Sequence, residues 1–361
     1  KITITEFKDY SYKKNYEEES KKEINEEFKT KKSKDLEITK KTKRETFESM
    51  ELDSKYEIVN EPLNKRLKSD TEKIILKAPR YYNNNRENFI EFINKLFLPY
   101  KQQLLQEEEQ IRNGTIKIDC ESNKKGEFSL LIHQQLVRDY INLFTPYRGL
   151  LLYHGLGSGK TCTSIAIAEG LKNNKKIMVL TPASLKENYI DELKKCGDYL
   201  YKKNQYWEFI DIKENKEYIK PLSSILKLSE EYIISKGGAW LINSSKEANY
   251  EVQTFKDKQT IDEQINKMIL YKYEFIKYNG LQNHHLKGLT NDYTINPFTN
   301  KVIIIDEAHN FISRIANKIK NPSSLSMKLY EYLKTAENCK IILLTGTPII
   351  NYPNEIGILF N

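Results

Sequence analysis

The chain has 361 residues, enough for two or more domains at the usual size of ~100–200 residues each. Its 58 lysine and arginine residues exceed its 50 aspartate and glutamate residues, and the net charge of +8 is compatible with a polyanionic partner. No apolar run approaches the ~18 residues of a membrane-spanning helix and no signal-peptide pattern opens the sequence, which excludes a helical membrane domain within these residues.

Residues 1–77 are rich in interspersed lysine and glutamate. Such a segment buries little apolar surface alone and is typical of a disordered or solvated helical extension. A docking arm for a partner is the alternative interpretation. From Ala78 the composition changes, and apolar residues recur at helical spacing within 89–97, which predicts a helical module over 78–125.

Beyond this module, short apolar runs alternate with helical segments. Continuous β-branched runs are typical of strands that helices cover on both faces, so we expect a doubly wound parallel α/β domain over 126–361. A less periodic stretch at about 200–270 predicts an insertion with a small β element of its own. The predicted strands are RGLLLYH (148–154), KIMVLTP (176–182), KVIIIDE (301–307) and KIILLTG (340–346).

The cysteines are spread widely along the chain and form no closely spaced pair. This usage predicts reduced thiols rather than a disulfide framework or a zinc site. His284 and His285 have no cysteine or suitably spaced carboxylate nearby, so we predict no metal role for them. The cysteines are Cys120, Cys162, Cys196 and Cys339.

The segment GLGSGKTC (155–162) follows the first predicted strand and predicts a phosphate-binding loop. Its glycines let the backbone wrap phosphates, Lys160 supplies a cation for the β and γ phosphates, and Thr161 offers a hydroxyl to magnesium. His154 stands where such loops usually have their first glycine. A chance match in a loop is the alternative for this motif alone. The predicted nucleotide-binding residues are Gln134, Gly155, Leu156, Gly157, Ser158, Gly159, Lys160, Thr161 and Cys162.

Gln134 precedes the first predicted strand, and its amide can pair with the donor and acceptor edge of adenine. A plain surface glutamine is the alternative interpretation of this position.

Asp306-Glu307-Ala308-His309 follows the apolar run Val-Ile-Ile-Ile at 302–305 of a predicted strand. We expect Asp306 to hold magnesium, usually through water, and Glu307 to orient or deprotonate the attacking water. A surface acidic turn is the alternative, but the joint occurrence with the phosphate loop predicts an ATPase that uses ATP and Mg2+. The predicted catalytic residues are Lys160, Glu307 and His309, and the predicted magnesium ligands are Thr161 and Asp306.

Thr345-Gly346-Thr347-Pro348 ends the last predicted strand. In this order along the chain, we expect Thr345, Gly346 and Thr347 to couple the γ-phosphate site to the motion of a neighbouring domain. The motif alone would indicate only a turn.

Gln134 and the segments GLGSGKT, LTPASL, IIIDEAH and LTGTP together resemble motifs Q, I, Ia, II and III of superfamily 2 helicases and translocases. The TGTP form of motif III is more similar to Swi/Snf-type translocases than to DEAD-box RNA helicases, which usually carry Ser-Ala-Thr. Longer segments such as RDYINLFTPYRGLLLYHGLGSGKTC and NPFTNKVIIIDEAHNF resemble helicase-like ATPases of nucleocytoplasmic large DNA viruses, relatives of the poxvirus early transcription factor small subunit above all. This resemblance covers about 78–361.

The resemblance implies a RecA-like first lobe in which His154 is an ordinary occupant of its position. It implies duplex DNA, a large transcription factor subunit and a viral RNA polymerase as partners, no membrane, and a place in the virion and the host cytoplasm. It implies that a second lobe outside this chain brings an arginine finger, so that this lobe binds ATP but hydrolyses it weakly alone. An RNA helicase, or a virion-packaged genome-binding component with a silent ATPase, are the alternatives.

The same resemblance assigns a nucleic-acid contact to two segments, LTPASL and YNGL. The first would touch a phosphate backbone through hydroxyl and N–H groups. Ser184 could instead cap the following helix, and Asn279 could be a turn residue. The implied nucleic-acid residues are Thr181, Pro182, Ser184 and Asn279.

Overall fold

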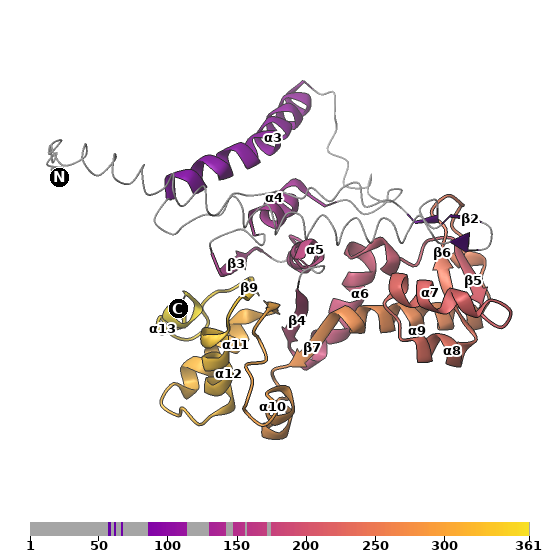
Figure 1. Cartoon of the computed structure of the whole chain (residues 1–361). Coiled ribbons are helices and arrows are strands. Elements are labelled where there is room, and N and C mark those ends of the chain that lie inside the picture. The colour runs from indigo at the N-terminus through magenta and orange to yellow at the C-terminus, as the bar shows by residue number, and fades with distance from the viewer. Residues whose placement is uncertain are drawn as a thin grey trace, which may run out of the picture. The chain divides into compact units, whose positions relative to one another are not determined.

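The chain divides into two compact units, Lys1–Lys68 and Ser69–Asn361. In the first unit, strand β1 (Glu57–Ile58) pairs antiparallel with strand β2 (Glu61–Pro62). A computed structural model describes residues 57–58, 61–62, 66–67, 86–113, 130–141, 147–155, 157–171 and 175–360 (Figure 1).

Several predictions fall outside the described residues. They concern most of the extension over 1–77, residues 114–129, which include the end of the predicted helical module, and Leu156 of the phosphate loop. Among the helices that the structure describes, none is long and apolar enough to cross a membrane.

The core of the second unit is a sheet of five parallel strands in the order β3-β9-β8-β4-β7. Residues Val302 to Ile305 of the DEAH strand are all buried, as expected for a strand that helices cover on both faces. This arrangement confirms the predicted parallel α/β fold and the four strands predicted from apolar runs. The strands are β3 (Gly149–Tyr153), β4 (Lys176–Thr181), β7 (Tyr273–Lys277), β8 (Lys301–Ile305) and β9 (Lys340–Thr345).

Strand β7 is absent from the strands predicted by sequence. Its five residues, YEFIK, carry Glu274 and Lys277, which interrupt the apolar run on which the prediction depended. Tyr273 and Ile276 are nevertheless buried, and the Glu274 carboxylate accepts a hydrogen bond of 2.8 Å from the Lys301 Nζ of β8. Pairing with β4 therefore makes a strand of a sequence with weak strand character.

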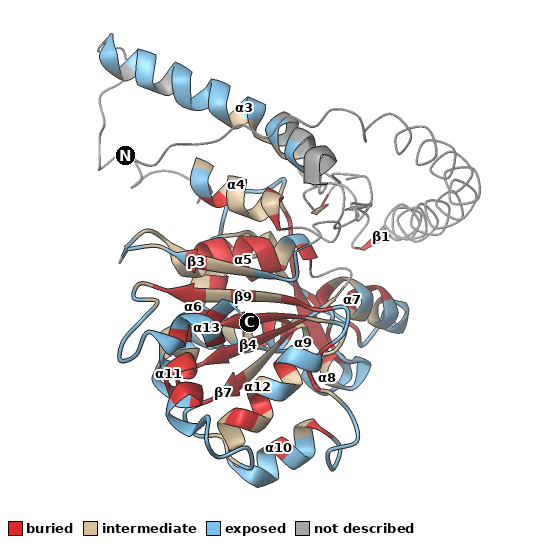
Figure 2. Cartoon of the chain, turned by 90° about the vertical axis from the view of Figure 1, so that its left-hand side faces the viewer, coloured by how far each residue is buried: buried red, intermediate tan, exposed pale blue. Residues whose placement is uncertain are grey.

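Helices cover both faces of the sheet (Figure 1). Helices α5, α6 and α9 pack together on one face, and helices α11 and α12 pack on the other. Helix α5, which follows the phosphate loop, is buried almost all round (Figure 2), in line with its small and apolar side chains. The helices of this layer structure are α4 (Ile132–Tyr140), α5 (Lys160–Leu171), α6 (Lys186–Cys196), α9 (Phe255–Lys272), α10 (Asn283–Leu289), α11 (Ala308–Lys318), α12 (Leu325–Thr335) and α13 (Asn354–Phe360).

The predicted insertion contains the small β element that was expected. Strands β5 (Trp207–Asp211) and β6 (Gly238–Ile242) form an antiparallel pair. Helices α7 (Ile219–Leu226) and α8 (Glu230–Lys236) lie between them in the chain. The buried amide of Gln264 on α9 accepts from the Trp240 backbone N–H and donates to the Trp240 carbonyl, each at 2.8 Å, which ties β6 to the α/β layers.

Helix α3 (Arg86–Arg112) is the helix predicted from the apolar spacing of the module that precedes the sheet. Its described side chains are largely exposed (Figure 2). It meets α4 through a hydrogen bond from the Tyr100 hydroxyl to the Asp139 carboxylate and through the rings of Phe97 and Tyr140, whose centroids lie 6.5 Å apart. Among the described side chains, these polar and ring contacts connect the helix to α4.

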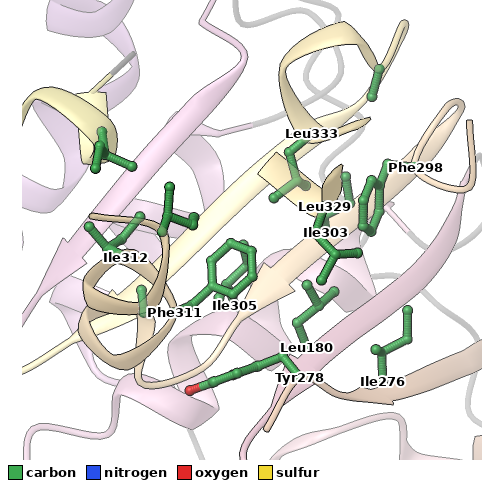
Figure 3. Packing of buried hydrophobic residues seen from close by; sticks show 14 of the residues in the cluster. Leu180, Ile276, Tyr278, Phe298, Ile303, Ile305, Phe311, Ile312, Leu329 and Leu333 are labelled. Atoms are coloured by element: carbon green, nitrogen blue, oxygen red, sulfur yellow. The ribbon is translucent and has the colours of Figure 1, made fainter. Parts of the chain in front are cut away.

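A hydrophobic cluster fills the space between the sheet and helices α11 and α12 (Figure 3). It includes Leu180 and Ile305, which lie at or near the carboxyl ends of β4 and β8, and Phe311 of α11. This packing fixes the strand ends that carry the sequence motifs. Figure 3 labels Leu180, Ile276, Tyr278, Phe298, Ile303, Ile305, Phe311, Ile312, Leu329 and Leu333 of this cluster.

The prediction of reduced thiols is wrong for Cys162 and Cys196, which form a disulfide in the structure. The packing of α5 against α6 brings their Cα atoms to 5.5 Å although 34 positions separate them in the chain. Sequence spacing carries no information about such a long-range approach, and this is why the prediction failed. Cys339 is buried and free.

Candidate nucleotide-binding site

The phosphate loop lies between the end of β3 and the start of α5. Gly157 and Gly159 have φ angles of +79° and +76°, in the left-handed region that favours glycine. A Cβ atom at Gly159 would lie 2.4 Å from the Nε2 atom of Gln134. The backbone angle therefore favours glycine at this position, and any larger residue would also displace the Gln134 side chain.

Lys160 folds back over its own loop. Its Nζ atom donates to the carbonyl oxygens of His154 at 3.1 Å and Gly155 at 3.2 Å. The Thr163 hydroxyl donates to the Gly159 carbonyl at 3.0 Å and helps to hold the start of α5. The loop therefore presents one lysine cation and a helix N-terminus, which together suit the phosphates of a nucleotide.

The structure gives Gln134 a role that its sequence position did not indicate. The side chain is only 3% exposed. Its Nε2 atom donates to the Gly159 carbonyl at 3.3 Å, and its Oε1 atom accepts from the Leu131 backbone N–H at 3.0 Å. Both ends of the amide thus bind backbone, so Gln134 supports the loop, and an adenine contact stays a prediction.

His154 joins the phosphate loop to its neighbours. Its backbone N–H donates to the Thr345 carbonyl at 3.3 Å, and its ring meets the His133 ring edge to face at 5.7 Å. His133 in turn donates from Nε2 to the Ser158 carbonyl at 3.2 Å. Burial lowers the pKa of the His154 imidazole, and His133 and Lys160 lower it further. His154 is thus a neutral packing residue of the loop.

Asp306 lies directly after the DEAH strand, and its carboxylate is largely desolvated. The pKa of this carboxyl is raised to about 6, chiefly by burial and then by the neighbouring Glu307 carboxylate, while the hydrogen bond from the Glu307 backbone N–H and the charge of Lys160 act in the opposite direction. The electrostatic effect of Lys160 indicates that the carboxylate and the loop lysine share one site. Carboxylate and hydroxyl oxygens are the donors that Mg2+ prefers, so Asp306 and the half-buried Thr161 at the start of α5 fit this ion.

Glu307 adopts a left-handed backbone conformation, with φ of +47°. Its Oε2 atom lies 3.4 Å from the His309 Nδ1 atom, and this nitrogen lies 2.9 Å from the Thr345 hydroxyl. The same hydroxyl accepts from the Thr347 backbone N–H at 3.0 Å. The His309 ring therefore connects the DEAH carboxylate to the TGTP turn.

The TGTP turn also approaches the phosphate loop. A Cβ atom at Gly346 would lie 3.6 Å from the Lys160 Nζ atom and 3.6 Å from the His154 carbonyl oxygen. Together with the bond between His154 and Thr345, this approach places the three predicted motifs at one edge of the sheet. Movement of any one of them would disturb the other two.

The side chain of Cys162 points away from the phosphate loop, so nucleotide binding by this residue through its backbone stays a prediction. Its side chain is buried and bonded to Cys196 of α6, and the Glu192 carboxylate lies 3.4 Å from its Sγ atom. The sulfur therefore belongs to the contact between two helices.

Two of the four predicted nucleic-acid residues are buried. Thr181 is fully buried, with its hydroxyl directed to the Pro182 carbonyl at 3.4 Å, and Pro182 is buried as well. A hydroxyl contact from Thr181 to a phosphate backbone is therefore wrong, because the residue completes a central strand. Ser184 and Asn279 are exposed and remain predictions.

Ser184 is not a helix cap, contrary to the alternative interpretation. It lies within a 3-10 turn at Ala183–Leu185, and α6 begins after that turn with no side-chain cap. The turn and Asn279 follow adjacent strands, β4 and β7, whose last residues pair as Thr181 and Lys277. Exposed polar groups of the two strand ends therefore share one edge of the sheet.

The motif patterns missed two buried residues that shape the site. The Tyr278 hydroxyl donates to the carbonyl oxygens of Asp306 and Glu307. The Glu355 carboxylate, 1% exposed, accepts from the Ile350 backbone N–H at 2.8 Å and holds the chain that follows TGTP. Neither residue belongs to a sequence motif, and their importance comes from burial and hydrogen bonds that only the structure shows.

A family model described as "Type III restriction enzyme, res subunit" matches residues 127–350, more than half of the chain. The chain belongs to this family. The match covers the phosphate loop, the DEAH turn and the TGTP turn, and it supports nucleotide hydrolysis as the chemistry of this site.

Relatives from large DNA viruses confirm the resemblance to viral helicase-type ATPases. A protein of Acanthamoeba polyphaga mimivirus, provisionally named an ATP-dependent RNA helicase, is 33% identical over 285 residues, which are 78% of this chain and 39% of that protein. A protein of Invertebrate iridescent virus 3, provisionally named a helicase, is 29% identical over 64% of this chain and 20% of its own length. A homologue of the termination factor NPH-I from African swine fever virus is 26% identical over 59% and 22%.

The chain spans well under half the length of each of these relatives. Among solved structures, the SWI2/SNF2 ATPase core of Sulfolobus solfataricus in complex with double-stranded DNA matches 62% of this chain and 33% of its own. The sequence identity is 18% and the TM-score is 0.31.

Proposed function

We propose that this chain is the nucleotide-binding lobe of an ATP-driven translocase that tracks duplex DNA during transcription of a large viral genome. The observation that carries the proposal is the His309 ring, which connects the Glu307 carboxylate to the Thr345 hydroxyl. This contact links the group expected to act on water with the turn expected to respond to the γ-phosphate. A lobe that only stored nucleotide would have no need of that link.

In this proposal each motif acts on a different part of bound ATP. Lys160 neutralises the β and γ phosphates once it leaves its carbonyl partners, while the helix N-terminus after the loop attracts the same charge. Asp306 and Thr161 hold Mg2+, which when bound neutralises charge on the phosphates. Glu307 orients the attacking water and accepts its proton.

The protein is proposed to work with further components. An arginine finger from a second lobe would complete the site, because phosphoryl transfer gains roughly 10³–10⁵ in rate from such a group. The positive net charge and the exposed Ser184 and Asn279 suit a phosphate backbone. A large transcription factor subunit and a viral RNA polymerase are the proposed partners, in the virion and in the host cytoplasm.

The preference for transcription and for DNA has two supports. One relative, from African swine fever virus, is named a homologue of a termination factor, which is a transcription function. The TGTP turn, in place of Ser-Ala-Thr, is similar to translocases that move on duplex DNA without separating strands.

The test is the ATPase rate of the full-length protein with no nucleic acid, with duplex DNA, with single-stranded DNA and with RNA. We expect duplex DNA to raise the rate most, by about tenfold or more, because the phosphate backbone would order the exposed strand ends. Exchange of duplex DNA for a polyanion such as heparin controls for charge alone. Stimulation by RNA and not by DNA would contradict the proposal.

A second candidate, an RNA helicase, is favoured by the provisional name of the mimivirus relative. A strand-displacement assay separates the two functions. ATP-dependent separation of an RNA duplex supports this candidate, whereas DNA-stimulated hydrolysis without strand separation supports the translocase.

A further inference from the structure

Tyr278 directly follows strand β7 and lies between the end of β4 and the DEAH turn. We infer that Tyr278 is a positioning residue that fixes the Glu307 carboxylate for ATP hydrolysis and ties it to the exposed end of β7. The inference rests on the proposed hydrolytic function of this site. Figure 3 shows the Tyr278 ring beneath Phe311, with its hydroxyl oxygen directed away from Ile276.

The Tyr278 hydroxyl binds the backbone of the turn that carries the acidic residues. It donates to the carbonyl oxygens of Asp306 and Glu307, each at 3.1 Å, so one hydrogen is shared by two acceptors. These two carbonyls belong to consecutive residues and can face one donor only when the chain turns between them.

That turn is the left-handed conformation of Glu307, which has a φ of +47°. A residue other than glycine keeps such a conformation only where its surroundings hold it there. The Glu307 backbone N–H donates to the Asp306 carboxylate at 3.0 Å, and the Glu307 carbonyl accepts from the Tyr278 hydroxyl at 3.1 Å and from the Asn310 backbone N–H at 2.9 Å. Loss of the hydroxyl would therefore release one of the three backbone contacts that hold Glu307 in this conformation, while the contact of its carboxylate with His309 would remain.

Tyr278 itself is fixed from three sides. Its backbone N–H donates to the Thr181 carbonyl at 3.3 Å, and its carbonyl accepts from the Arg314 guanidinium of α11 at 3.3 Å. Its ring packs edge to face on Phe311 at 5.6 Å, and the residue is 3% exposed. The ring therefore has a single position, and so does its hydroxyl.

The residues around Tyr278 in the chain reach solvent. Lys277, Asn279 and Gly280 are all exposed, next to the buried tyrosine. A partner that contacts Asn279 would act on the residue next to Tyr278, and the hydroxyl of Tyr278 binds the DEAH turn. Tyr278 thus connects the predicted nucleic-acid edge to Glu307 through one hydrogen bond.

A matched control distinguishes this role from ordinary burial of a tyrosine. Tyr273 starts the same strand, is fully buried, and donates from its hydroxyl to the Glu169 carboxylate at 2.6 Å, away from the DEAH turn. Tyr278→Phe and Tyr273→Phe each remove one buried hydroxyl and keep the ring. Thermal unfolding of both variants shows whether each remains folded.

The first measurement is ATP turnover by the full-length protein with duplex DNA. We expect Tyr278→Phe to lower kcat about tenfold with KM for ATP unchanged, since one hydrogen bond to the turn is lost while the phosphate loop is untouched. Tyr273→Phe should keep kcat within about twofold. A folded Tyr278→Phe protein with normal kcat, or an equal loss of kcat in both variants, would overturn the inference.

The second measurement does not depend on hydrolysis. Amide hydrogen exchange at 306–310 should become faster in Tyr278→Phe and stay unchanged in Tyr273→Phe, because only the first variant releases the turn. Unchanged exchange in Tyr278→Phe would refute the positioning role even in a protein that hydrolyses no ATP. A wild-type protein without ATPase activity but with this exchange pattern would instead refute the proposed function alone.

Discussion

Asp306 combines two properties that oppose each other at neutral pH. Its carboxylate is desolvated, which raises its pKa to about 6, and yet it must be ionised to hold a cation. The folded state therefore keeps a proton that the unfolded state loses at about pH 4, and this contribution to stability disappears as the pH rises toward 6. A bound Mg2+ restores the missing counter-charge and favours the ionised form.

A pH dependence of nucleotide binding follows from this residue. We expect the affinity of the full-length protein for Mg·ATP to fall by up to about tenfold per unit as the pH drops below about 6, because protons compete with Mg2+ at Asp306. A higher concentration of Mg2+ should move this loss of affinity to lower pH. The measurement is fluorescent-nucleotide titration between about pH 5 and about pH 8.

Asp306→Asn should remove the loss of Mg·ATP affinity at low pH. The control is Glu331→Gln, which changes an exposed carboxylate paired with Lys334 on α12 and should keep that loss. If the affinity of Asp306→Asn falls at low pH as that of the wild type does, another group titrates and the assignment to Asp306 is wrong.

Single residues also mark the limit of sequence reasoning. Lys160, Asp306 and Glu307 could be placed in one site because their motifs follow apolar strands whose carboxyl ends share an edge. The surroundings of Gln134 and Thr181 could not be predicted, since burial at those positions depends on which loop or strand packs beside them. A motif gives the position of a residue but not its partners.

At the scale of elements, four strands were predictable because each is a continuous apolar run between helical segments. Strand β7 was not, because Glu274 and Lys277 break its run, and only pairing with β4 defines it as a strand. The contact between α5 and α6 was equally hidden, since the two cysteines that it joins are 34 positions apart.

The disulfide between α5 and α6 predicts a redox-dependent stability. Closure of a loop of 34 positions by Cys162 and Cys196 should contribute about 3–4 kcal/mol by restricting the unfolded chain. A thiol reductant should therefore lower the thermal midpoint of the wild-type protein and leave that of Cys196→Ser unchanged.

Cys339→Ser is the control, because Cys339 is buried and unbridged and should respond to reductant as the wild type does. If reductant has no effect on the wild type while a metal chelator lowers its midpoint, Cys162, Glu192 and Cys196 hold a metal ion instead of a disulfide.

At the scale of the whole molecule, one edge of the sheet carries both candidate activities. The phosphate loop and the DEAH and TGTP turns lie at the ends of β3, β8 and β9, and the exposed polar groups lie at the ends of β4 and β7. Because β8 lies beside β4, a shift at the nucleic-acid edge would reach Glu307 through adjacent strands. The viral relatives are much longer than this chain, so the proposed second lobe has a place within that family.

The most direct test of the site is to measure Mg·ATP affinity and ATP turnover in two variants of the full-length protein, Glu307→Gln and Lys160→Ala. Glu307→Gln should keep the dissociation constant within about threefold and lower turnover by about a hundredfold or more, because it removes the base but leaves the phosphate contacts. Lys160→Ala should weaken binding itself by about tenfold or more, since it removes the cation of the loop. Lys318→Ala, at the exposed end of α11, should change neither quantity. Normal turnover in Glu307→Gln, or normal affinity in Lys160→Ala, would contradict the account.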